Sequence, residues 1–164
     1  PGILAAESSW VATVHLDKIP KDVAIVHQVR EPMAWLNSYV RAPGAQSTIE
    51  LVLPGFSAGM TKQPVTTAML LWTTWGSRIS GSGRISARYQ LEEIDVDRVI
   101  SLAELADYSI TRHSAEIAID IVPRTYNTHP QWADHVQLTW DDLPPGSARD
   151  GFVAMAREYG YVVP

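Results

Sequence analysis

The chain has 164 residues, of which 46% are hydrophobic and 19% charged, a composition typical of one globular domain and not of a disordered chain. It contains no cysteine, which excludes disulfides, thiolate metal sites and a cysteine nucleophile, and it has no apolar run long enough to span a bilayer. The net charge of −5 is uneven: residues 1–90 carry eight basic and five acidic side chains, and residues 91–164 carry five and thirteen. This balance argues against binding of nucleic acid and is compatible with a small anionic ligand on the first half.

Residues 22–30 predict a strand, because the segment is short, rich in β-branched residues and almost continuously apolar, as in parallel strands covered on both faces. Pro32 suits the first turn of a helix, and apolar residues recur at helical spacing as far as Val40, so a helix is expected over 32–42. Residues 43–64 hold several prolines and glycines and predict a long loop of the kind that shapes a binding pocket.

The rest of the chain continues this alternation of strands and helices. The predicted helices are 65–79, 101–107, 112–122 and 148–159, and the predicted strands are 84–91 and 135–140. The segment Gly81-Ser82-Gly83 is expected to stop the first of these helices, and Gly160 to cap the last. Strands that alternate with helices predict an α/β fold with three layers and a mostly parallel sheet.

Arg30 and Ser38 form the candidate ligand-binding pair. Arg30 ends the predicted strand 22–30, and open α/β sheets bind ligands outside the carboxyl ends of their strands. Its guanidinium offers a planar fork of donors that fits a phosphate, and Ser38 adds a hydroxyl two turns into the next helix. The N-terminus of that helix is expected to add backbone donors. The competing interpretation is an ion pair between Arg30 and a nearby carboxylate such as Glu31.

The surrounding pattern resembles the sulfotransferase family, over nearly the whole chain. The run Val26-His27-Gln28-Val29-Arg30-Glu31-Pro32, with Ser38 eight residues after the arginine, is similar to the family's second nucleotide motif. Supporting resemblances are Leu71-Trp72-Thr73-Thr74-Trp75, Arg88-Tyr89-Gln90-Leu91-Glu92-Glu93-Ile94, Leu138-Thr139-Trp140-Asp141-Asp142-Leu143-Pro144, Gly160-Tyr161 and Glu7-Ser8-Ser9-Trp10.

This resemblance implies a nucleotide-binding fold of the P-loop type and transfer of a sulfuryl group from 3′-phosphoadenylyl sulfate to a hydroxyl or amine acceptor. Arg30 and Ser38 would hold the 3′-phosphate of this donor, and no metal would be needed. The family's opening strand and phosphosulfate loop have no counterpart before Glu7. Because the chain also begins at Pro1, we expect a single domain, 1–164, that lacks its first strand, is inactive alone and leaves an uncovered edge beside 22–30. Without a signal-peptide pattern, the expected location is cytoplasmic. The alternatives are a non-catalytic sulfotransferase-like binding domain and a fragment of a P-loop kinase.

The catalytic base has two candidates in the chain. Members of the family use a histidine or a glutamate to accept the proton of the acceptor. His15 lies only 15 residues before Arg30, whereas Glu7 is the only acid among the first sixteen residues, and we favour Glu7 over His15. A base in the absent N-terminal segment is the third possibility.

Other conspicuous residues favour structural roles. His27 is expected to be a hydrogen-bonded core histidine, and Trp72 and Trp75 to be core or pocket wall. His129 and His135 fit no strong metal-ligand spacing. Glu92 either orients a pocket element or is a solvated strand end. Gly81 to Arg84 is in the wrong order for a phosphate loop, since it follows a helix and precedes a strand.

Overall fold

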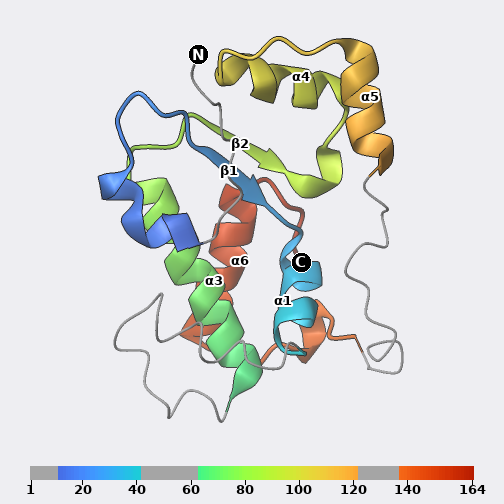
Figure 1. The fold of residues 1–164 in the computed structure, drawn as a ribbon. Coiled ribbons are helices and arrows are strands. Elements are labelled where there is room, and N and C mark those ends of the chain that lie inside the picture. The colour runs from blue at the N-terminus through green and yellow to red at the C-terminus, as the bar shows by residue number, and fades with distance from the viewer. Residues whose placement is uncertain (1–10, 42–62, 122–136) are drawn as a thin grey trace.

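The computed structural model describes residues 11–41, 63–121 and 137–164 (Figure 1). In these residues the fold is mixed α/β, with five α-helices and two strands. The strands are β1 (Val26–Val29) and β2 (Ala87–Gln90). The α-helices are α1 (Pro32–Tyr39), α3 (Pro64–Gly81), α4 (Val96–Leu105), α5 (Arg112–Ile121) and α6 (Ser147–Glu158). Three short 3-10 helices are η1 (Val11–Lys18), η3 (Leu91–Glu93) and η5 (Trp140–Asp142).

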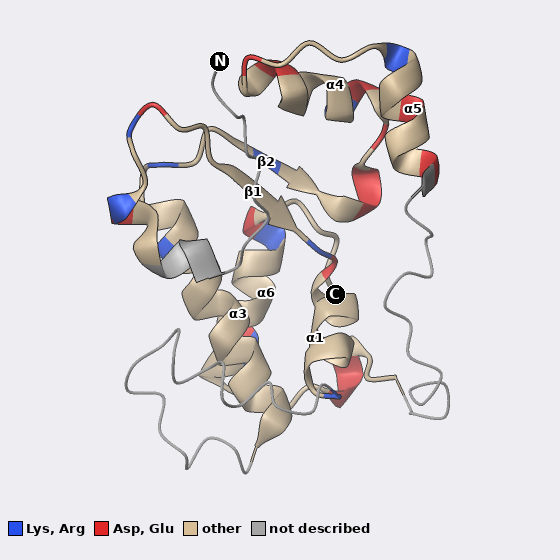
Figure 2. Ribbon diagram, viewed as in Figure 1, with Lys and Arg blue, Asp and Glu red and all other residues tan. Residues whose placement is uncertain are grey.

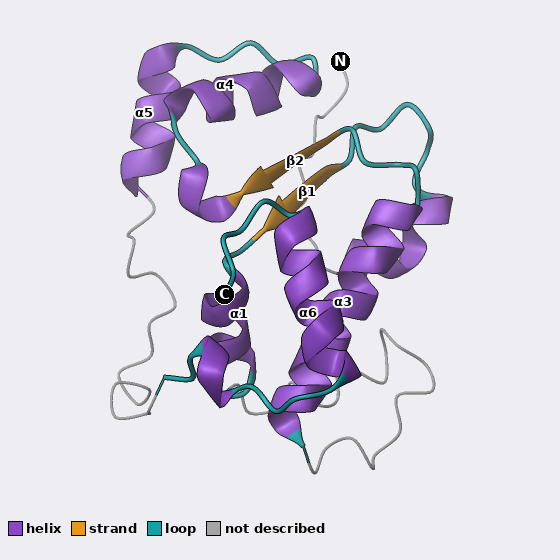
Figure 3. Cartoon of the chain, turned by 180° about the vertical axis from the view of Figure 1, so that it is seen from behind, coloured by secondary structure: helices purple, strands orange, loops and turns teal. Residues whose placement is uncertain are grey.

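The two strands form a parallel sheet, as the alternation of strands and helices predicts. Val26 pairs with Ala87 and Val29 with Gln90, so the strands also end at the same edge. The α1, α3 and α6 helices lie on one side of this sheet, and α4 and α5 lie on the other (Figures 1 and 3). The mixed α/β class and the parallel sheet are therefore confirmed. Among the described residues β1 pairs only with β2, and Val26 on β1 is 36% exposed.

The hydrophobic core lies between the sheet, α1, α3 and α6. Its most deeply buried side chains include Leu36 of α1, Met69 of α3 and Phe152 of α6. Trp72 contacts Phe152 edge to face, with ring centroids 5.0 Å apart, and contacts Tyr159 in the same way at 5.3 Å. The prediction that Trp72 belongs to the core is thus confirmed.

Two helix ends agree with the sequence. The α3 helix ends at Gly81, and Gly83 then takes a left-handed φ of 64°, so the Gly-Ser-Gly segment is a helix stop. The α6 helix ends at Glu158, and Gly160 adopts a φ of 85°, the conformation that favours glycine after a helix C-terminus.

The predicted start of the helix that corresponds to α4 is wrong. A helix was expected over 101–107, but α4 already begins at Val96, because the Asp95 carboxylate caps it by accepting the Arg98 N–H at 2.7 Å. The α5 helix matches the expected 112–122 closely. Acidic residues outnumber basic ones along this helix pair (Figure 2).

The predicted strand over 135–140 is also wrong within the described residues. Gln137 to Thr139 form no strand, and η5 begins at Trp140. The Asp142 carboxylate accepts both the N–H and the hydroxyl of Thr139, each at 2.8 Å. This local cap turns the chain into a short helix, which the alternation of apolar residues before it does not reveal.

Candidate functional site

Arg30 directly follows β1, at the edge where both parallel strands end, and its side chain is exposed. Figure 2 shows this edge with adjoining basic and acidic residues after β1 and an acidic stretch after β2. Arg30 makes no ion pair with any residue that the structure describes. The guanidinium therefore remains available to an anion.

The competing interpretation, an ion pair between Arg30 and Glu31, is wrong. The Glu31 carboxylate instead caps α1, accepting the N–H of Met33 at 3.1 Å and that of Ala34 at 2.5 Å. This arrangement also corrects our expectation that the N-terminus of α1 offers free donors, because the chain's own carboxylate already occupies two of them. An anion at Arg30 would rely on side chains.

Ser38 lies in the second turn of α1, on the side away from the core. Leu36 and Asn37 form the buried face of the helix, whereas Ser38 is half-buried. Seven residues make nearly two helical turns, so Ser38 lies almost directly along the helix axis from the cap residue Glu31. Arg30 precedes this cap residue, outside the helix. The convergence of Arg30 and Ser38 on one anion stays a prediction.

A hydrogen-bonded junction lies beside Arg30 at the end of β2. Glu92 Oε1 accepts the Glu31 N–H at 2.8 Å, and Glu92 Oε2 accepts the Tyr161 hydroxyl at 3.0 Å. Gln90 Nε2 donates to the Tyr159 carbonyl at 2.7 Å. The segment after α6 is thereby attached to the edge that carries Arg30. The sequence singles out Glu92 but does not reveal its partners, which lie 61 and 69 residues away.

Burial raises the pKa of Tyr161, and its hydrogen bond to Glu92 and the nearby carboxylates of Glu92, Glu31 and Glu93 raise it further. Each of these carboxylates disfavours a phenolate in its neighbourhood. Tyr161 therefore keeps its proton and remains a hydrogen-bond donor to Glu92.

His27 lies inside β1 and points toward the α3 and α6 side of the sheet. Its ring meets Tyr159 edge to face at 5.4 Å between centroids, and Arg88 lies 4.4 Å over the centroid of the same tyrosine ring. Burial and the neighbouring Arg88 lower the pKa of His27 to about 4. The histidine is partly buried, as a residue packed against the core, but Nδ1 is buried with no hydrogen-bond partner among the described residues, which corrects the expected hydrogen bond.

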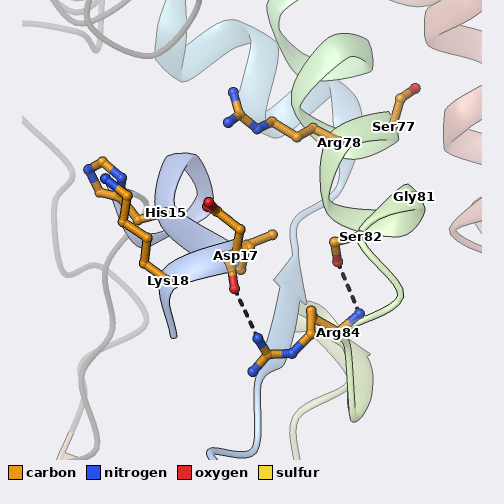
Figure 4. Close-up of a pocket in the computed structure, with 9 residues that line it drawn as sticks. His15, Asp17, Lys18, Ser77, Arg78, Gly81, Ser82 and Arg84 are labelled. Atoms are coloured by element: carbon orange, nitrogen blue, oxygen red, sulfur yellow. Dashed lines mark hydrogen bonds between the residues drawn. The ribbon is translucent and has the colours of Figure 1, made fainter. Parts of the chain in front are cut away.

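His15 lies at the opposite end of the sheet from Arg30. It belongs to η1, which precedes β1, and it lines a cavity of about 670 Å³ between η1 and the end of α3 (Figures 1 and 4). Arg84 closes one side of this cavity by donating to the carbonyls of Leu16 and Ile19 at 3.1 and 2.8 Å. The structure therefore does not bring His15 and Arg30 together.

Several predicted features lie outside the described residues. These are Glu7, the loop 43–64 except its last two residues, and the pair His129 and His135. Within the ranges that the structure does describe, no three histidine or acidic side chains are grouped as a metal site would require. No helix in those ranges is long and apolar enough to cross a membrane.

Comparison with known proteins identifies no relative of this chain. No protein-family model, no curated protein and no solved structure matches the chain. Any assignment of function therefore depends on the residues at the edge of the sheet.

Proposed function

We propose that this chain is the nucleotide-binding part of a sulfotransferase-like enzyme of P-loop type, which moves a sulfuryl group from 3′-phosphoadenylyl sulfate to a hydroxyl or amine acceptor. The observation that carries the proposal is that Arg30 is exposed and makes no ion pair with a described residue. It is exposed at the carboxyl end of a parallel strand, and the nearest carboxylate in sequence, Glu31, is held by the helix it caps. This is the place where open α/β sheets bind their ligands.

Arg30 would hold the donor's 3′-phosphate through two parallel N–H donors of its guanidinium, and Ser38 would add one hydroxyl. The carboxylates of Glu31 and Glu92 do not compete for Arg30, because backbone N–H groups and the Tyr161 hydroxyl already engage their oxygens. In the proposed reaction the donor would supply the sulfuryl group, its sulfur–oxygen bond to phosphate would break, and the acceptor oxygen or nitrogen would form the new bond to sulfur.

The proton released by the acceptor requires a base. Glu7 remains our candidate within the chain, and His15 at the far end of the sheet is poorly placed to act beside a donor held by Arg30. Positioning of the donor and acceptor, and not metal chemistry, would supply the main rate advantage.

Calorimetric titration with two nucleotides tests the proposal. The unaltered chain is expected to bind adenosine 3′,5′-bisphosphate at least tenfold more tightly than adenosine 5′-monophosphate. Arg30→Ala should remove this preference, at a cost of about 2–3 kcal/mol for a lost charge-assisted contact, and Ser38→Ala should reduce it by about 1 kcal/mol. Arg98→Ala is the matched control, because Arg98 is an exposed arginine on α4.

Equal affinity for both nucleotides in the unaltered chain, or a preference that survives Arg30→Ala, would reject the proposal. Binding with the expected preference, in a longer form of the protein that transfers no sulfuryl group, would favour the non-catalytic binding domain.

A further inference from the structure

The carboxylate of Glu92 joins three separate segments at the edge where Arg30 lies. One oxygen accepts the N–H of Glu31, which belongs to the peptide bond between Arg30 and Glu31, at 2.8 Å. The other oxygen accepts the Tyr161 hydroxyl, from the segment after α6, at 3.0 Å. The end of β2 thus holds the backbone next to the proposed anion ligand, while the end of the chain holds Glu92.

The two hydrogen bonds have complementary effects. The bond to Glu31 N–H restrains the Arg30 backbone directly, and the bond from Tyr161 restrains the rotation of the Glu92 carboxylate. Tyr161 is the donor in this bond, because burial and the surrounding carboxylates raise its pKa and keep its proton in place, and an ionised carboxylate can only accept. Binding sites need their groups held within roughly half an ångström, so a restraint one residue from the ligand arginine affects affinity.

We propose that Glu92 is a positioning residue for the anion site, with Tyr161 as the residue that orients it. This inference rests on the proposed role of Arg30. Glu92 does not touch the nucleotide; it fixes the turn between β1 and α1 so that the guanidinium of Arg30 is presented at one place. The same carboxylate would otherwise be an unfavourable neighbour for a bound phosphate.

The neighbouring residue Glu93 makes a sharp control. It lies next to Glu92 in η3, carries the same charge, is exposed, and makes no side-chain hydrogen bond to a described residue. If charge alone mattered, removal of either carboxylate would make the edge less negative and tighten the binding of a phosphate. If Glu92 positions Arg30, removal of the Glu92 carboxylate should instead weaken the binding of the phosphate, whereas removal of the Glu93 carboxylate should not.

The test measures the preference for adenosine 3′,5′-bisphosphate over adenosine 5′-monophosphate in four variants of the whole chain. We expect Glu92→Ala to reduce the preference about tenfold and Tyr161→Phe about threefold, the scale of one lost hydrogen bond. Glu92→Gln should retain most of it, because the amide oxygen still accepts the Glu31 N–H. Glu93→Ala should leave the preference unchanged or increase it. The proposal would be overturned if Glu92→Ala showed as strong a preference for the bisphosphate as Glu93→Ala.

Hydrogen exchange of the Glu31 amide separates this proposal from the proposed function. Glu92→Ala and Tyr161→Phe should speed exchange at that amide, and Glu93→Ala should not. Faster exchange, in a chain that shows no preference for the bisphosphate, would reject the nucleotide function and leave the restraint on the turn established. Unchanged exchange in Glu92→Ala would refute the restraint itself. If Glu92→Ala does not fold, the comparison of Tyr161→Phe with Glu93→Ala provides the test, with Glu92→Gln as the variant expected to behave like the unaltered chain.

Discussion

Asn37 and Leu138, which lie 101 residues apart in the chain, are joined by two hydrogen bonds. Asn37 Nδ2 donates to the Leu138 carbonyl at 2.9 Å, and the Leu138 N–H donates to Asn37 Oδ1 at 2.8 Å. Asn37 Nδ2 also donates to the Met33 carbonyl at 2.9 Å. The side-chain amide thus gives Leu138 the two partners that a neighbouring strand would otherwise provide, and it attaches the segment before η5 to α1.

Replacement of Asn37 by leucine keeps the side-chain volume but leaves the N–H and the carbonyl of Leu138 without these partners. We expect the free energy of unfolding to fall by about 2–3 kcal/mol, as measured by denaturant titration. Gln137→Ala is the control, because Gln137 is exposed and adjacent, and it should change stability by less than about 0.5 kcal/mol. A loss for Asn37→Leu no larger than that of the control would contradict the role of the amide.

Gly76 is expected to tolerate no side chain, although it lies in the middle of α3. A Cβ at this position would overlap the Tyr159 hydroxyl and lie 3.0 Å from Met155 Sδ. Helix propensity favours alanine over glycine by about 1 kcal/mol, whereas overpacking costs about 1–3 kcal/mol, so Gly76→Ala should destabilise the protein. Gly81→Ala is the control, because a Cβ there meets nothing within 4 Å.

A double-mutant cycle identifies the cause. The Tyr159 hydroxyl is buried and makes no hydrogen bond of good geometry to a described residue, although Ser80 lies near enough to lower its pKa, so Tyr159→Phe should cost little. In that background Gly76→Ala should be less destabilising, and thermal unfolding of the four proteins measures the difference. Additive effects of the two substitutions would show that contact with the Tyr159 hydroxyl is not the cause of the destabilisation by Gly76→Ala.

His27 makes stability depend on acidity. Its pKa is about 4 in the folded protein and near 6.5 in the unfolded chain, so the unfolded state binds the extra proton first. The contribution of the neutral His27 to the free energy of unfolding is therefore fully present above pH about 6.5, and it is lost as the pH falls toward 4. Because the imidazole is only partly buried, we expect a loss of about 2 kcal/mol, less than the full shift implies.

Chemical denaturation at several pH values, with His27→Gln as the variant, measures this contribution. The variant should flatten the decline of stability between pH 6.5 and 4, whereas His113→Gln, on the exposed surface of α5, should not. Parallel pH profiles for the variant and the unaltered chain would show that His27 is not the group responsible.

Arg84 holds the segment that contains His15 against the start of β2. Its guanidinium donates to the carbonyls of Leu16, Ile19 and Pro20, at distances of 3.1, 2.8 and 2.8 Å. Arg84→Ala should therefore release this segment, and trypsin should cleave after Lys18 about tenfold faster or more. Arg98→Ala leaves these bonds intact and is expected to keep the original cleavage rate. An unchanged rate in Arg84→Ala would show that other contacts hold η1.

The sequence predicts the elements that local chemistry determines. The strand before Arg30, the proline at the start of α1 and the glycines after α3 and α6 are all short-range signals, and each element is present. The strand is shorter and less covered than expected, because β1 spans only Val26–Val29 and only Val29 is buried. The strand expected over 135–140 fails for the opposite reason. Its apolar alternation is real, but its backbone partner is a side chain, Asn37, whose proximity no local pattern reveals.

In the candidate site, too, the residues with a local signal can be predicted from the sequence, and the contacts between distant segments cannot. Arg30 can be found from its position after a strand, and Ser38 from its spacing along a helix. The attachment of Glu92 to Glu31 and Tyr161 depends on contacts across 61 and 69 residues, so it appears only once the chain is folded. The cap that Glu31 forms on α1 was missed although its signal is local, because the same carboxylate also suggested an ion pair with Arg30.

The parallel pairing of β1 with β2 also has a consequence for the order of folding. Each pair in the register joins residues 61 positions apart, whereas α4 and α5 are separated by only six residues. Closing the longer loop costs more chain entropy before any contact repays it, so the helix pair forms early and the sheet late. Val29→Ala in β1 should therefore speed unfolding in stopped-flow experiments and leave the folding rate nearly unchanged.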